Sequence, residues 1–243
     1  MKGSTTPFLL LVLIALIALA TRSASHRGRV TGGEARSIYV LLGVLGSWGV
    51  VTSTLAIADV YSSPTFLALL PGLWLPLFPF ILTFAGMLFF PRLRSGLRTV
   101  LAETPWHRQI YVHAIRVLAI GTFIKVIAGE FPAYFALLVG IPDLLFGASA
   151  FFFGRYASHR PPSRRALITW NLAGIAAVLP APLLIQMGLP GPLQVFTGSP
   201  TGERLFDFPM VLAPTIVVPI FLLLNMAALW RVFETRPVKG ATP

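Results

Sequence analysis

The chain has 243 residues and a mass of 26.4 kDa; 56% of its residues are hydrophobic and only 11% are charged. A soluble domain carries roughly 25% charged residues, so this composition, with a mean hydropathy of +0.80, excludes a soluble protein. Long uncharged runs recur along the whole chain, which indicates that most of the surface faces a lipid bilayer.

Charge and cysteine content exclude several classes of function. The chain has no cysteine, which removes disulfides, cysteine-ligated zinc, iron–sulfur clusters and a cysteine nucleophile. Its formal charge of +11 would suggest a nucleic-acid partner in a soluble protein. In a membrane protein, basic residues in short loops are a topology signal instead. We therefore expect the lipid bilayer as the partner, and no nucleic acid.

Apolar segments of membrane-spanning length recur seven times. Each is close to the roughly 20 residues that a helix needs to cross the hydrocarbon core. Their continuous hydrophobicity predicts helices, because barrel strands are shorter and alternate. The sequence therefore predicts an all-α integral membrane protein, a seven-transmembrane-helix bundle in a single domain over residues 1–243. The predicted spans cover residues 5–21, 37–58, 66–90, 109–127, 131–154, 167–187 and 208–230.

Basic residues concentrate in alternate connections, which predicts the orientation. With seven helices, these connections all fall on one face, and the positive-inside rule then places the N-terminus outside and the C-terminus inside. The opposite face holds only Lys2 and Arg204. The preference for arginine over lysine suggests a bacterium, so we expect a multi-pass protein of a bacterial plasma (inner) membrane. The basic residues on the predicted inner face are Arg22, Arg27, Arg29, Arg36, Arg92, Arg94, Arg98, Arg108, Arg155, Arg160, Arg164, Arg165, Arg231, Arg236 and Lys239.

Two segments leave alternatives open. Lys2, the following apolar run and the small residues 18–20 resemble a cleavable signal peptide. The arginines that follow favour a retained first helix instead. The Gly/Pro-rich connection 188–207 is either a lid or a plain connector, and loop statistics favour the connector.

Two ionisable residues at membrane depth are predicted to pair. The fourth and fifth helices are joined by a tight turn at 129–132, with Pro132 suited to a helix start. In an antiparallel hairpin, Arg116 and Asp143 then differ in depth by two residues, or about 3 Å along the axis. A lone charge at that depth costs at least about 2.5–3.5 kcal/mol. We therefore predict an Arg116–Asp143 ion pair inside the bundle.

Further polar residues can form a cluster with this pair. His113 lies one turn from Arg116 on the same helical face, and Asn171 and Asn225 lie at a similar depth on the sixth and seventh helices. The predicted intramembrane polar cluster is His113, Arg116, Asp143, Asn171 and Asn225. Its functional interpretation is a site for a small polar or anionic solute, or a proton relay. The alternative interpretation is hydrogen bonding that holds helices together, which we favour for the two asparagines.

Lys125 and the prolines receive structural interpretations. Lys125 is about half a turn around the helix from Arg116, so we expect it outside that site, paired with Glu130 or Asp59.

Prolines in later helices either free carbonyls that bind cations or simply kink the helices; we favour kinks. These prolines are Pro71, Pro76, Pro79, Pro180, Pro182, Pro214 and Pro219.

Known membrane chemistries lack their residues. The seventh helix has no lysine for a retinal Schiff base, and only His113 among the four histidines lies clearly within the membrane, which excludes bis-histidine haem. The sequence contains no HExxH and no GxSxG motif. We therefore expect no enzyme activity, no cofactor and no metal site.

Three functions remain in order of preference. The first is a non-catalytic sensor or accessory membrane module that packs against another membrane protein or a second copy of itself. The second is a small-solute or proton-linked transporter, with Arg116 and Asp143 in or beside its pathway. The third is a membrane enzyme. A carrier would be expected to have more charged residues along its pathway than a single pair, so the sensor or accessory module is favoured.

Overall fold

The protein is a bundle of seven long apolar helices, described by a computed structural model over residues 4–234. That range contains helices and no strand, which confirms the prediction of an all-helical fold with seven helices, here called spans, that are long and apolar enough to cross a membrane. We number these spans in chain order, and several consist of two or three consecutive helical segments. Spans 1 and 2 are single helices, α1 (Thr6–His26) and α2 (Gly32–Ile57). Span 3 consists of α4 (Pro71–Trp74), η2 (Leu75–Leu77) and α5 (Phe78–Phe89), and span 4 consists of α7 (Trp106–Tyr111), η3 (Val112–Ala119) and α8 (Ile120–Ile127). Span 5 consists of α9 (Ala133–Phe135), η4 (Ala136–Gly140) and α10 (Ile141–His159), span 6 of α11 (Arg164–Ala176) and α12 (Ala181–Gly188), and span 7 of η6 (Ala213–Val217) and α13 (Val218–Glu234).

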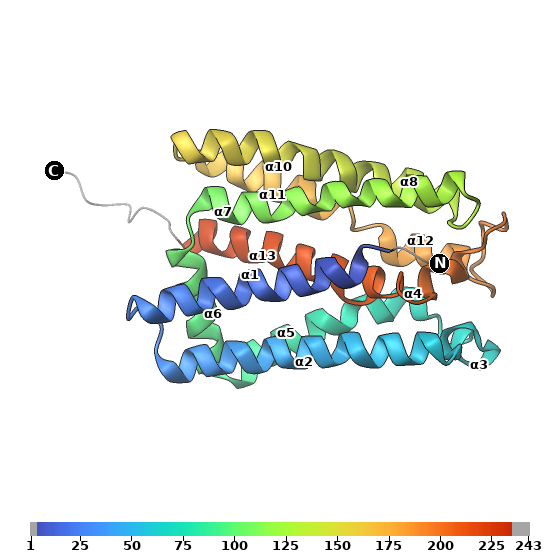
Figure 1. Ribbon diagram of the computed structural model, residues 1–243, viewed down its shortest axis with the longest axis horizontal. Helices are drawn as coiled ribbons and strands as arrows, with labels where there is room; N and C mark the ends of the chain where they lie inside the picture. Colours follow the sequence, from blue (N-terminus) through green and yellow to red (C-terminus); the bar gives the residue numbers. More distant parts are fainter. Residues whose placement is uncertain (1–3, 235–243) are drawn as a thin grey trace.

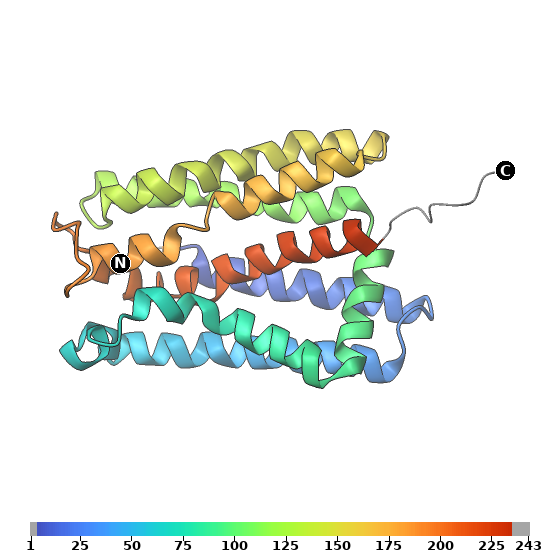
Figure 2. The ribbon, with the colours of Figure 1, turned by 180° about the vertical axis from the view of Figure 1, so that it is seen from behind.

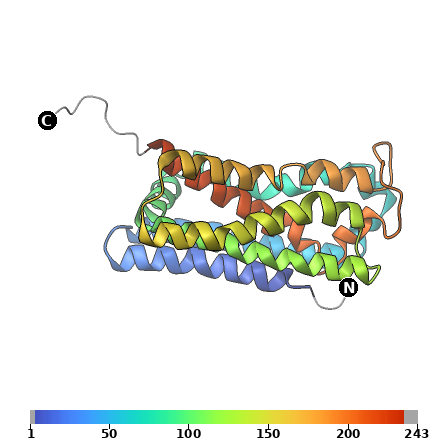
Figure 3. The same ribbon diagram turned by 90° about the horizontal axis from the view of Figure 1, so that it is seen from above.

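The spans lie side by side along the long axis of the molecule (Figure 1). The connection between α1 and α2, the connection between α10 and α11, and the end of α13 share one end of the bundle, seen from behind in Figure 2. We call it the arginine-rich end. Residues 189–212 lie at the other end, as Figure 3 shows from above. This opposite end also carries the short helices η1 (Val60–Ser62), α3 (Pro64–Leu67) and η5 (Gly202–Phe206).

Local backbone chemistry moves several predicted boundaries. Span 2 begins at residue 32 rather than 37, because Thr31 and Glu34 form a capping box in which each side chain accepts a hydrogen bond from the other residue's backbone N–H. Span 3 begins at Pro71 rather than at residue 66, because Leu70 adopts a left-handed conformation, with φ of 54°, that separates it from α3. Span 7 begins at residue 213 rather than 208.

The arginine-rich segment after span 3, expected to be a loop, forms the helix α6 (Pro91–Glu103). This helix lies across the end of the bundle (Figure 1, Figure 2). Leu93, Gly96 and Val100 are buried at intervals of three and four residues, which gives α6 one apolar face for packing against α2. Arg231 of span 7 donates hydrogen bonds to the carbonyls of Ala102 (3.0 Å) and Thr104 (2.6 Å), and so holds the C-terminal end of α6.

Glycines bring spans 4 and 5 into close backbone contact. Gly140, Gly147 and Gly154 recur every seven residues on span 5, and this pair of spans makes the most extensive contact in the described chain. A Cβ atom at Gly147 would lie 2.7 Å from the backbone nitrogen of Val117, and one at Gly154 would lie 2.7 Å from the ring of Tyr111. The absence of side chains at these positions therefore sets the distance between the two spans.

The first prediction tests this glycine contact. Gly147→Ala places a methyl group against the backbone of η3, so we expect a loss of about 1–3 kcal/mol, the usual cost of overpacking. Gly121→Ala is the matched control, because a Cβ there meets nothing within 4 Å. Unfolding in mixed micelles should show the control within about 1 kcal/mol of the parent. Equal stability of the two variants would contradict close backbone packing at Gly147.

Candidate functional site

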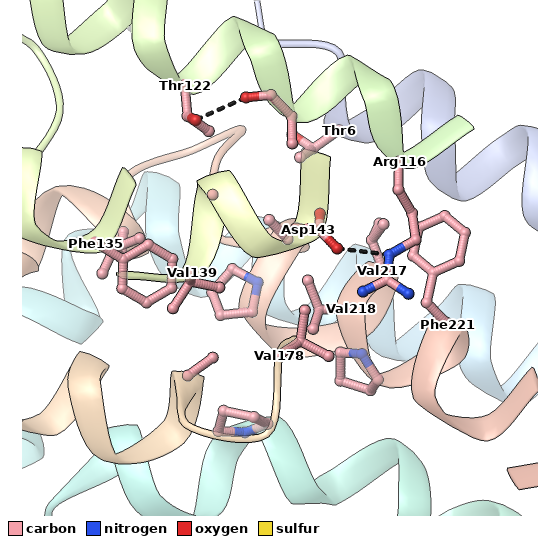
Figure 4. A pocket seen from close by; sticks show the side chains of 18 of the residues that line it. Thr6, Arg116, Thr122, Phe135, Val139, Asp143, Val178, Val217, Val218 and Phe221 are labelled. Atoms are coloured by element: carbon pink, nitrogen blue, oxygen red, sulfur yellow. Dashed lines mark hydrogen bonds and ion pairs between the residues drawn. The ribbon is translucent and has the colours of Figure 1, made fainter. Parts of the chain in front are cut away.

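The centre of the site is an ion pair between spans 4 and 5. Arg116 Nε donates a hydrogen bond to Asp143 Oδ1 at 2.5 Å, drawn as a dashed line in Figure 4. The Arg116 side chain has no exposed surface, whereas that of Asp143 is 16% exposed. Gly129 turns the chain between the two spans with φ of +70°, which produces the hairpin register from which the pair was predicted. The predicted contact between these two residues is present.

The other atoms of the guanidinium have fewer polar partners. Nη2 donates a long hydrogen bond of 3.4 Å to the carbonyl of Gly174 on span 6. The guanidinium carbon lies 4.4 Å from the centre of the Phe146 ring and 5.6 Å from that of Phe221, so two aromatic faces also stabilise the cation. Nη1 is buried without a hydrogen-bond partner among the described residues. One donor group of Arg116 is thus unsatisfied.

Gly174, on span 6, makes room for the Phe146 ring beside Arg116. A Cβ atom at this position would lie 2.3 Å from the Phe146 ring, so only glycine lets that ring lie between span 6 and Arg116. Its carbonyl accepts the hydrogen bond from Nη2. Sequence reasoning missed Gly174, because an isolated glycine in an apolar helix carries no signal of its partner on another helix.

His113 lies beside the pair in an aromatic environment. It is 2% exposed, and its ring centre lies 5.4–5.8 Å from the ring centres of Phe146, Trp170 and Phe221. Its Nδ1 has no hydrogen-bond partner in the described part of the chain. His113 therefore shares two aromatic neighbours with Arg116 and packs as an aromatic ring.

The two asparagines of the predicted cluster bond within their own helices. The Asn171 amide donates to the carbonyl of Leu167 at 2.8 Å, and the Asn225 amide donates to that of Phe221 at 3.1 Å. Both side-chain oxygens are buried without a partner in residues 4–234. Neither residue bonds to Arg116 or Asp143, and neither amide donates a hydrogen bond between helices.

A cavity of about 330 Å³ adjoins the ion pair. Figure 4 shows Asp143 directed towards Arg116 among apolar side chains of the lining. Thr6, Thr122 and Lys125 add polar groups to the wall. Lys125 thus lines the same cavity as Arg116, although half a turn of helix separates the two residues, and it interacts electrostatically with Glu130, one of its two expected partners. The labelled apolar lining residues are Phe135, Val139, Val178, Val217, Val218 and Phe221.

Five spans depart from α-helical geometry where they line this cavity. η2 and η3 are 3₁₀ segments, η4 and η6 are π-helical segments, and residues 177–180 form a turn between α11 and α12. Irregular backbone at membrane depth is tolerated where it is buried in protein or lines a cavity, and π segments occur frequently at functional sites. The prolines interpreted as kinks contribute to these departures. One lining residue from each segment, in chain order, is Pro76, Arg116, Val139, Val178 and Pro214.

The family comparison coincides with this region. A model described as a domain of unknown function, DUF8737, matches residues 73–233. The chain belongs to the DUF8737 family. The matched DUF8737 region contains the ion pair and all five irregular segments, whereas spans 1 and 2 lie outside it. No curated protein and no solved structure matches the chain.

The arrangement has the chemistry of a binding site. Residues 4–234 contain no group of three histidine or acidic side chains that could hold a metal ion. The site instead offers an acceptor on Asp143, which is held in place by the buried Arg116, and an apolar wall. Such a site can orient a small molecule by hydrogen bonds and exclude water around its apolar part.

The second prediction concerns the ion pair. Asp143→Asn or Arg116→Gln alone leaves its partner's charge buried, so each should cost about 3–5 kcal/mol. The double variant should recover part of that loss, because no unpaired charge remains. The measurement is the free energy of unfolding in mixed micelles.

The control for this cycle is the exposed pair of Arg29 and Glu103, whose atoms are 2.9 Å apart. Neutralising either partner there should cost at most about 1 kcal/mol. If the losses at Arg116 and Asp143 simply add in the double variant, the two residues are not coupled, and the site is wrong as described.

Proposed function

We propose that the protein is a multi-pass protein of a bacterial inner membrane that binds a small molecule inside its helical bundle, as a non-catalytic sensor or accessory module. One observation carries this proposal: five spans become irregular around a single cavity, and a buried ion pair lies on the wall of that cavity. A buried charge pair and interrupted helices are costly in a membrane, and binding of a ligand would give both features a function.

The dimensions and lining of the cavity support a ligand. Its volume of about 330 Å³ falls within the roughly 300–1,000 Å³ range of small-molecule sites. Such sites are mainly apolar, with a few polar groups that fix orientation, which matches an apolar wall with Arg116 and Asp143 at one place. The exposed part of the Asp143 carboxylate would gain a donor from a ligand.

Transport is the second candidate, supported by the broken spans. Carriers bind substrates near the middle of the membrane between discontinuous helices, and spans 3 and 6 are both interrupted beside the cavity. A carrier must open to both sides. At the arginine-rich end, α6 and its bonds to Arg231 cover the bundle, so this conformation favours binding over passage. Flux of a bound probe across proteoliposomes would establish transport.

The distribution of charge supports the N-out, C-in orientation. The described segments that carry the basic residues predicted for the inner face share one end of the bundle, while Lys2, Arg236 and Lys239 lie outside the described residues. At the opposite end, Arg204 is neutralised by Asp207 at 2.9 Å. The difference in net charge between the two ends is the pattern expected from the positive-inside rule.

The third prediction tests this orientation by single-cysteine labelling, for which a chain without cysteine is a ready background. Ser199→Cys at the opposite end and Ser158→Cys at the arginine-rich end replace exposed serines. In intact cells, a membrane-impermeant maleimide should label only Ser199→Cys. Both variants should react after permeabilisation. Labelling of Ser158→Cys in intact cells would overturn the orientation.

The fourth prediction tests whether the cavity binds anything. Val218→Phe adds a ring to a half-buried position on the cavity wall, whereas Val50→Phe makes the same change on the outer face of α2, where Val50 is 66% exposed. A thermal-shift screen of small amphipathic molecules in nanodiscs should find compounds that stabilise the parent and Val50→Phe but not Val218→Phe. If no compound shows this difference, the proposed binding function is wrong.

A further inference from the structure

We propose that the ligand is a neutral amphipathic molecule drawn from the bilayer, with a hydroxyl group at one end and a short apolar body. The hydroxyl donates a hydrogen bond to the Asp143 carboxylate, the member of the ion pair whose side chain is exposed at the cavity. This inference rests on the proposed function, namely that the cavity binds a small molecule, and it specifies the chemical class of that molecule.

The polar end follows from the donors and acceptors of the ion pair. The Arg116 side chain has no exposed surface, so Asp143 is the member of the pair that a ligand in the cavity can reach. Asp143 can only accept when ionised, and its side chain retains 16% exposure next to the cavity. The ligand must therefore supply a donor, and a hydroxyl is a donor that carries no charge.

The charge balance selects a neutral ligand. Arg116 and Asp143 together carry no net charge, so an anion at this place is attracted by one residue and repelled by the other, and the same holds for a cation. A charged ligand would also lose its hydration on entering the membrane interior, which costs far more than transfer of a hydroxyl. The ion pair cannot offset that loss, because one of its members attracts a charged ligand while the other, at nearly the same distance, repels it.

Lys125 is the remaining charged side chain of the lining. It lies nine residues further along span 4 than Arg116, towards the opposite end. An anionic ligand bound near Lys125 would offer no donor to the Asp143 carboxylate. A carboxylic acid is therefore the most demanding comparison for the proposed alcohol, and the experiment includes it.

The apolar body follows from the size and surroundings of the cavity. The volume of about 330 Å³ lies at the lower end of the roughly 300–1,000 Å³ range of small-molecule sites, which fits a ligand with a short apolar body. Leu77 and Leu179 line the cavity and are 44% and 65% exposed. The cavity therefore opens sideways towards lipid, where apolar molecules are concentrated.

The test compares four fluorinated probes of equal chain length by ¹⁹F NMR with protein in nanodiscs. The probes are 8,8,8-trifluorooctan-1-ol, the corresponding carboxylic acid, the corresponding amine, and 1,1,1-trifluorooctane, which has no hydrogen-bonding group. Nanodiscs without protein supply the signal of probe dissolved in lipid. We expect a distinct bound signal for the alcohol, with at least about ten-fold tighter binding than each other probe, because hydrogen bonds to charged groups are the strong ones.

Variants separate the ligand class from the binding function. The double variant Arg116→Met with Asp143→Leu keeps an apolar cavity, so it should bind alcohol and trifluorooctane equally. A matched double variant, Arg29→Met with Glu103→Leu, should retain the preference for the alcohol. Val218→Phe should abolish the bound signal, and Val50→Phe should keep it.

The outcomes are distinguishable. If all four probes bind the parent equally, or the acid binds best, the cavity binds small molecules but the proposed class is wrong. If the alcohol preference survives in Arg116→Met with Asp143→Leu, the hydroxyl is not recognised by the ion pair. If the folded parent shows no bound signal with any probe, the binding function and the ligand class fail together.

Discussion

The ion pair between Arg116 and Asp143 is the constraint on which the rest of the structure depends. Each charge alone would cost at least about 2.5–3.5 kcal/mol at the centre of a bilayer, so the bundle must hold the two together and away from lipid. The turn at Gly129 sets their depth, and Gly147 lets the backbones approach. Gly174 then admits the Phe146 ring against the guanidinium. Three glycines, one in the turn between spans 4 and 5, one on span 5 and one on span 6, thus serve one contact.

The cavity follows from the same constraint. A regular helix presents all its side chains on one continuous surface and satisfies its own backbone. The 3₁₀ and π segments and the turn at 177–180 break that regularity in spans 3 to 7, so the spans cannot close completely around the pair. The resulting space has an apolar wall, while Arg116 retains an unsatisfied donor. Backbone irregularity and unpaired polarity meet at one place, which is why we locate the binding function there.

Hydropathy and loop charge were sufficient to predict the seven spans, and hairpin geometry was sufficient to predict the contact of Arg116 with Asp143. Both inferences rest on the number of residues between positions along the chain, which can be counted in the sequence. The helix α6 was missed because its exposed arginines conceal an apolar face of only three buried residues. The start of span 2 was missed because hydropathy does not register the capping box of Thr31 and Glu34.

Other features depend on contacts between distant segments, which no local pattern reveals. The role of Gly174 requires knowing that Phe146 faces it. The inclusion of Lys125 in the cavity wall depends on how widely spans 4 to 7 separate. The hydrogen bonds of Asn171 and Asn225 within their own helices are equally invisible in a sequence, where an amide in an apolar helix predicts only that it is buried.

The most direct test of this account measures the ion pair in a bilayer. Solid-state NMR of protein labelled with ¹⁵N arginine and ¹³Cγ aspartate reports the dipolar coupling between the two side chains. The chain has three aspartates, and Asp207 pairs with Arg204, so the measurement uses Asp207→Asn as background. The account predicts one strong arginine–aspartate coupling, which disappears when Asp143→Asn is added. The absence of any coupling in the Asp207→Asn protein would contradict it.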